Sequence, residues 1–85
     1  MPTVSEFFGI RIEMRYLPKE HNPPHIHAFY GDTKGVIDIQ TLDVLKGNLN
    51  SRTIKLIKEW ITEHKIKLLE MWNTQRIEKI ISKEW

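Results

Sequence analysis

Hydrophobic and polar residues alternate strictly near the start of the chain. From residue 8 to residue 16 every second position is apolar or aromatic, and the positions between them are glycine, arginine or glutamate. A period of two is typical of a β-strand with one buried face. The pattern returns over residues 25–30 and 36–40, which a glycine-bounded turn at 31–35 connects, and a short fourth stretch follows at 43–49. The pattern therefore predicts three or four strands.

The period changes from two to that of a helix near residue 50. Asn50 or Ser51 is suited to cap a helix, and apolar residues then recur at steps of three and four as far as Met71. This spacing predicts a long amphipathic helix from about residue 51 to about residue 75. Isoleucines at 77, 80 and 81 continue the spacing, so we expect a helical tail that reaches Trp85.

Strands followed by one helix in so short a chain indicate an α+β domain. We expect a single domain over residues 1–85, a two-layer fold in which an antiparallel meander of three or four strands is covered on one face by the C-terminal helix. The strands would lie within about residues 7–49.

The composition narrows the classes of function. The 85 residues contain no cysteine, which excludes disulfides and thiolate metal ligands. The chain shows no apolar run of membrane length and no signal-peptide pattern, so we expect a cytoplasmic protein without a membrane partner. A net charge of +2 permits an RNA or DNA partner without requiring one.

A stretch rich in histidine and proline follows the first predicted strand. Three of the four histidines lie between residues 21 and 27, around a Pro-Pro pair. Because side chains alternate between the two faces of a strand, His25, His27 and Phe29 share one face of the strand that begins there. These three residues are the starting point for a candidate site.

Alternation on the neighbouring strands adds charged residues to the same face. If every strand turns its apolar side to the helix, a carboxylate lies on each side of the histidine pair, an arrangement that orients imidazole rings. The opposite face of the sheet then carries Arg11, Glu13, Arg15, His25, His27, Phe29 and Asp38.

Two kinds of chemistry fit this set of residues. The first is a metal site, in which His25 and His27 bind a divalent ion such as zinc, and His21, Glu13 or Asp38 completes the set of ligands. The second is acid–base cleavage of a phosphodiester, in which His25 and His27 transfer protons and Arg11 holds the phosphate.

A third possibility is a binding face without catalysis. Phe29 and the imidazoles would stack on bases or on the side chains of a partner, and Arg15 would contact phosphate. The preceding loop would add His21 and Asn22 to the contact. The fourth interpretation is a strand whose solvent face simply tolerates polar residues. Separately, Trp85 is a candidate anchor for a homodimer.

Several short stretches of the chain resemble a small bacterial family, domain of unknown function 4160. The histidine-proline stretch is the most specific of them, and the resemblance covers about residues 7–73. The stretches are Phe8–Ile12, His21–Ala28, Tyr30–Gly31, Leu45–Gly47, Ser51–Arg52 and Glu59–Trp60, followed by His64, Leu68 and Trp72. The chain departs from the family after Trp72, where relatives usually have a proline-containing tail.

The resemblance implies little chemistry, because the function of the family is itself unassigned. Its genes often lie beside a second small gene, which implies a toxin–antitoxin-like pair. We therefore expect an interaction module that binds a partner protein, or RNA or DNA, through the face formed by His25, His27 and Phe29. A small metal-independent ribonuclease or phosphodiesterase is the alternative, and a histidine metal site is the third.

Overall fold

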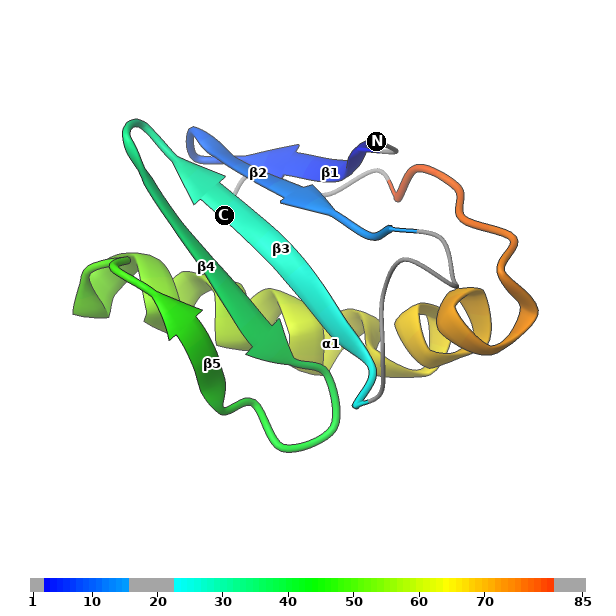
Figure 1. Ribbon diagram of the computed structural model, residues 1–85. Helices are drawn as coiled ribbons and strands as arrows, with labels where there is room; N and C mark the ends of the chain where they lie inside the picture. Colours follow the sequence, from blue (N-terminus) through cyan, green and yellow to red (C-terminus); the bar gives the residue numbers. More distant parts are fainter. Residues whose placement is uncertain (1–2, 16–22, 81–85) are drawn as a thin grey trace.

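The computed structural model describes residues 3–15 and 23–80, which form five strands and one helix (Figure 1). The strands lie side by side in chain order, each antiparallel to the next. The elements are β1 (Thr3–Phe7), β2 (Ile10–Glu13), β3 (His25–Tyr30), β4 (Thr33–Asp38), β5 (Val44–Gly47) and α1 (Ser51–Thr74). This confirms the predicted α+β class with an antiparallel meander and one long helix, although the sheet has one more strand than the largest number expected.

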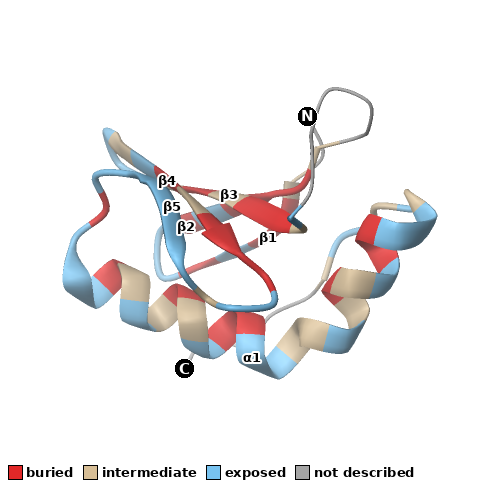
Figure 2. Ribbon diagram, turned by 60° about the horizontal axis from the view of Figure 1, so that its bottom comes forward, coloured by how far each residue is buried: buried red, intermediate tan, exposed pale blue. Residues whose placement is uncertain are grey.

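The sheet and the helix form two layers. In Figure 1 the sheet lies in front of α1, and in Figure 2 the buried residues of α1 lie on its side toward the sheet. The apolar residues of β2, β3 and β4 meet the helix there, and Phe7 stacks on Trp60 with 5.5 Å between the ring centres. Burial of each large apolar side chain contributes about 1.5–3 kcal/mol. The other face of the sheet is not covered by α1, and in this sense it is called the uncovered face.

The first hairpin corrects the predicted strand over residues 8–16. Phe8 and Gly9 form a two-residue turn between β1 and β2, with φ values of 49° and 79°. Tight hairpin turns of this kind need positive φ at both central residues. Phe8 is therefore 37% exposed and does not lie on the buried face, where the alternation placed it. β1, which precedes the turn, was not predicted.

The connection between β4 and β5 depends on glycine. Gly47 has a φ of 118°, and a Cβ atom at this position would overlap the carbonyl oxygen of Lys34 and the Cα of Gly35. Only glycine therefore lets β5 pair closely with β4 at this point.

The turn between β3 and β4, predicted over residues 31–35, is shorter than expected, because β4 begins at Thr33.

Helix α1 begins where the sequence predicts. The Asn50 side chain accepts a hydrogen bond from the Thr53 backbone N–H at 2.8 Å, as an N-cap residue does. His64 has non-helical backbone angles (φ −111°, ψ 16°), and its ring packs against Trp60 with 5.1 Å between ring centres. The helix is therefore kinked at His64, and its second half turns toward the end of the sheet where β3 begins (Figure 2).

The predicted helical tail is wrong for residues 75–80. Gln75 adopts a left-handed conformation (φ 59°), and its N–H donates to the Met71 carbonyl oxygen, which ends the helix. The chain then returns beside β1, where the Ile80 N–H donates to the Val4 carbonyl oxygen at 2.6 Å (Figure 1). Residues 81–85, including the candidate dimer anchor Trp85, lie outside the described residues.

Candidate functional site

The uncovered face of the sheet brings the predicted polar residues together in cross-strand rows. One row consists of Arg11 on β2, Phe29 on β3 and Lys34 on β4, each directly opposite the next. A second row runs from Glu13 on β2 to Lys46 on β5, by way of His27 and Val36. His25 lies opposite Asp38. The cross-strand neighbours expected from alternation are therefore found, whereas His21 and Asn22 lie outside the described residues.

The two histidines of β3 have different surroundings. Their ring centres are 5.3 Å apart, with the rings tilted by 66°. His25 is only 8% exposed, and its ring centre is 4.9 Å from that of Trp72 near the end of α1. His25 Nδ1 lies 2.8 Å from the Pro23 carbonyl oxygen. A carbonyl oxygen can only accept, so Nδ1 carries the proton and donates.

His25 is consequently fixed at the junction of the sheet and the helix. The kink at His64 turns the second half of α1, and this half carries Trp72 against His25. The contacts with Pro23 and Trp72 hold the imidazole in place from two sides. His27, two residues further on, is only partly buried. Of the two imidazoles, His27 is the one positioned to meet a ligand on the open face.

Arg11 connects the aromatic and acidic residues of this face. Its Nε lies 3.1 Å from the Glu13 carboxylate, and its Cζ lies 4.7 Å from the centre of the Phe29 ring. The side chain of Arg11 is 46% exposed, whereas that of Glu13 is largely buried. The cation–π contact and the ion pair hold the guanidinium over Phe29. Together Arg11 and Phe29 form a platform on which a planar group can stack.

Asp38 shapes the backbone next to the site. Its Oδ1 accepts hydrogen bonds from the N–H groups of Gln40 and Thr41, at 2.7 and 2.9 Å. An aspartate that accepts from the residues that follow it organises a turn, here the one after β4.

Over residues 3–15 and 23–80, no group of three or more His, Asp or Glu side chains is placed to hold a metal ion. Glu13, His25, His27 and Asp38 therefore do not converge on one point, and His21 lies outside the described residues.

A hollow of about 410 Å³ opens on this face beside His27 and Phe29. Three cations line it, and none of the described residues that line it is acidic. The lining residues are Arg15, His27, Phe29, Lys34, Gly35, Val36, Lys46 and Gly47. The hollow therefore combines an aromatic ring, an imidazole and positive charge, and its chemistry suits an anion that carries a planar group.

Lys34 and Lys46 are site residues that the sequence reasoning did not find. Lys34 was placed in the predicted turn at 31–35, although it lies two positions before Val36 and four before Asp38, on the same face of β4. Counting back from Asp38 in steps of two would have found it. Lys46 carried no such signal, because the register shifts between Val36 and Ile37 where β4 pairs with β5.

Comparison with known protein families gives one result. A family model described as Domain of unknown function (DUF4160) matches residues 9–73. The chain belongs to this family. The DUF4160 match includes β2, β3, β4 and β5 and nearly all of α1, and therefore the whole hollow. Comparisons with curated proteins and with solved structures gave no match. In the described part of the chain, no helix is both long and apolar enough to cross a membrane.

Proposed function

We propose that the uncovered face of the sheet binds single-stranded nucleic acid. The observation that carries the proposal is the hollow in which Phe29 and His27 lie among Arg15, Lys34 and Lys46. Proteins that bind single strands combine positive charge along the phosphate backbone with aromatic rings on which bases stack. Both requirements are met by neighbouring residues of this one surface.

The cross-strand rows support a particular arrangement of the ligand. Phe29 lies between Arg11 and Lys34 in its row, so a base stacked on the Arg11–Phe29 platform has Lys34 beside it. Neighbouring strands are about 4.8 Å apart, which places Lys34 within reach of the phosphate of that nucleotide. A duplex hides the faces of its bases, so this platform favours a single strand.

The surroundings of the two histidines favour binding over cleavage. A mechanism with two imidazoles needs both of them at the scissile phosphate, one as base and one as acid. His27 lines the hollow, whereas His25 is nearly buried and packs against Trp72. In the toxin–antitoxin-like gene pair that the family resemblance implies, the uncovered face would be the surface that contacts RNA or DNA.

Fluorescence anisotropy with a labelled single-stranded RNA of about twelve nucleotides tests the proposal. The Lys34→Gln/Lys46→Gln double variant should bind about 10-fold more weakly, and the slope of log K against log salt should fall by about 1.4, since each phosphate contact on a single strand contributes about 0.7. Arg76→Gln/Lys79→Gln is the matched control, because it removes two exposed cations from the segment after α1. The control should keep both the affinity and the slope.

The aromatic part of the proposal has its own variant. Phe29→Leu keeps an apolar side chain on β3 but removes the stacking surface, so RNA affinity should fall by about 1–3 kcal/mol. A duplex of the same sequence should bind the wild-type chain more weakly than the single strand does. Equal affinity for the duplex, or equal losses in the Lys34/Lys46 and Arg76/Lys79 variants, would contradict the proposal.

A further inference from the structure

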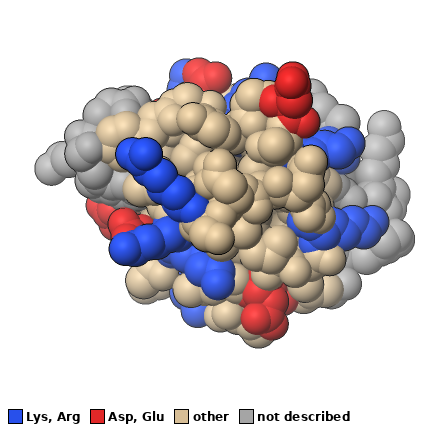
Figure 3. All heavy atoms as spheres, turned by 90° about the vertical axis from the view of Figure 1, so that its left-hand side faces the viewer, with Lys and Arg blue, Asp and Glu red and all other residues tan. Residues whose placement is uncertain are grey.

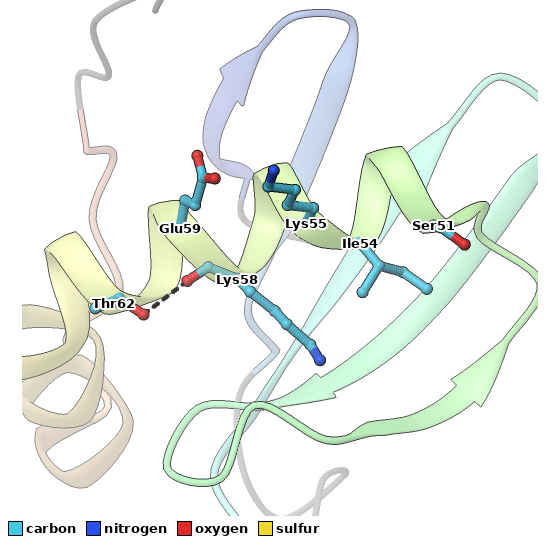
Figure 4. Close-up of a pocket in the computed structure, with 6 residues that line it drawn as sticks. All are labelled: Ser51, Ile54, Lys55, Lys58, Glu59 and Thr62. Atoms are coloured by element: carbon cyan, nitrogen blue, oxygen red, sulfur yellow. Dashed lines mark hydrogen bonds between the residues drawn. The ribbon is translucent and has the colours of Figure 1, made fainter.

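The hollow of the uncovered face differs in charge from two other hollows on the molecule. One of these runs along α1, where Lys55, Lys58 and Glu59 contribute to its lining (Figure 4). The other lies at the start of α1, where Arg52 and Glu59 contribute. Figure 3 shows the end of the molecule at the left of Figure 1, where basic and acidic side chains both reach the surface. Of the three hollows, only that of the uncovered face is lined by cations without a carboxylate among the described residues.

Lys34 and Lys46 lie close together on the uncovered face. Lys46 is directly opposite Val36 on β4, and Lys34 is two residues before Val36, so the two lysines are diagonal neighbours. Diagonal neighbours on one face of a sheet are about 7–8 Å apart, which long side chains can bridge. In the described part of the chain, neither lysine side chain forms an ion pair. Two ammonium groups placed in this way repel each other and favour an anion between them.

The carboxylates of the same face do not cancel this charge. Glu13 is paired with Arg11 at 3.1 Å, and the Asp38 carboxylate accepts hydrogen bonds from two backbone N–H groups. Neither of them lines the hollow. Arg15 lines it and adds positive charge, although Arg15 and His27 also have contacts within the chain. Lys34 and Lys46 are therefore the cations most available to a ligand.

The aromatic platform and the lysines are spaced for one nucleotide. Phe29 lies opposite Lys34 in one row, and the next row along β3 contains His27, Val36 and Lys46. The two rows are two residues apart, a distance of about 6.5–7 Å. One nucleoside spans a distance of this kind between its base and its phosphate. A base that stacks on Phe29 therefore leaves a phosphate over Val36, where both lysines can reach it.

The size of the hollow limits how much of a strand it can hold. Its volume is about 410 Å³, near the lower end of the range of about 300–1,000 Å³ that is usual for small-ligand sites. This volume has room for one nucleotide and not for a length of strand. The hollow therefore suits a single position of the nucleic acid, and the positive charge around it indicates which one.

We propose that the hollow binds the terminal phosphate of a single strand, a phosphate monoester, more tightly than a phosphodiester within the strand. This inference rests on the proposed function and specifies the part of the strand that the hollow takes. A monoester carries a charge of about −1.5 to −2 at pH 7, compared with about −1 for a diester. It also has three unesterified oxygens, so Lys34 and Lys46 each donate a charge-assisted hydrogen bond to it.

Competition between three unlabelled RNAs of one sequence of about twelve nucleotides tests the inference. The first has a 5′-phosphate, the second a 3′-phosphate, and the third hydroxyl groups at both ends; each displaces an internally labelled RNA from the full chain. One of the phosphorylated RNAs should compete about 10-fold better than the RNA with two hydroxyl ends. The RNA that does so identifies which end the hollow binds.

Lys34→Gln/Lys46→Gln is the variant that locates the terminal phosphate. Its readout is the ratio of the affinities for the phosphorylated and hydroxyl-ended RNAs, which cancels any loss that is common to both. The ratio should fall from about 10 to about 1 in this variant. Lys55→Gln is the control, because Lys55 is an exposed cation outside this hollow, and it should keep the wild-type ratio.

The outcomes separate this inference from the proposed function. Equal competition by all three RNAs would overturn the inference and leave the proposed function in place. A preference for a phosphorylated end that persists in Lys34→Gln/Lys46→Gln would place the terminal phosphate outside the hollow and would also overturn the inference. Failure of every RNA to bind the wild-type chain would contradict both.

Discussion

The two faces of β3 differ although their residues alternate one by one along the same six-residue strand. Ile26 and Ala28 point to α1 and are fully buried in the core. His27 and Phe29, one position away from them, are only partly buried and line the hollow on the uncovered face. A shift of one residue in register would exchange the two sets. One strand thus separates the residues that stabilise the fold from the residues that we propose bind a ligand.

This separation has a consequence for mutagenesis. Substitutions on the covered face should change the free energy of unfolding and leave the RNA affinity of the folded protein unchanged. Substitutions at the hollow should lower the RNA affinity and leave the free energy of unfolding unchanged. His25 is the exception, since it belongs to the polar set of β3 but is nearly buried against Trp72. Substitutions at Ile26 and His25 test how far the separation holds.

Ile26→Ala should have the largest effect on stability. Ile26 is fully buried opposite Ile37, and removing most of its side chain leaves a cavity, so we expect a loss of about 2–5 kcal/mol in the free energy of unfolding. Urea denaturation measures this loss. Ile26→Val should cost about 0.5–1.5 kcal/mol and keep full RNA affinity. Reduced affinity in folded Ile26→Val would show that the two faces are coupled.

His25→Ala should have an intermediate effect. It removes the donor to the Pro23 carbonyl oxygen and the ring that packs on Trp72, so we expect a loss of about 1–3 kcal/mol. In His25→Asn the side-chain N–H takes the place of Nδ1–H and should restore part of that stability. Both variants should have the same affinity for RNA, and the RNA should remain uncleaved with both. If His25→Asn were as stable as the wild type but had lost an RNA-cleaving activity, the acid–base hypothesis would replace ours.

Glu78→Gln should have the smallest effect, at a contact that belongs to neither face. A hydrogen bond from Lys67 to Glu78 raises the pKa of Lys67 above 10.5 and joins α1 to the segment beside β1. Because the pKa is raised on folding, this pair stabilises the fold below pH 10.5 and the contribution is lost as Lys67 deprotonates at higher pH. Wild type and Glu78→Gln should therefore differ slightly at neutral pH and converge in strongly alkaline solution. A difference that persists there would assign the effect to packing.

Much of the uncovered face could be predicted because it depends only on alternation. Arg11, Glu13, His25, His27 and Phe29 needed no more than a period of two and an antiparallel order. The surroundings of His25 could not be predicted, since its contact with Trp72 depends on the kink at His64. No residue near His64 in the sequence requires a kink.

The errors at the two ends of the chain have local causes. Phe8 continues an alternating pattern, and an aromatic residue gives no sign that its backbone adopts positive φ. The isoleucines at 77 and 80 keep helical spacing, but they pack against the core from a non-helical segment once Gln75 has ended α1. In both places apolar periodicity persisted where the backbone had already changed direction.

The most direct test of the account is a nuclear magnetic resonance titration of the labelled chain with single-stranded RNA of about twelve nucleotides. The largest chemical-shift changes should occur at His27, Phe29, Lys34 and Lys46, with little change at Ile26 or along α1. Changes centred on Lys55 and Lys58 of α1, or no saturable change on the sheet, would contradict the claim that the uncovered face binds nucleic acid.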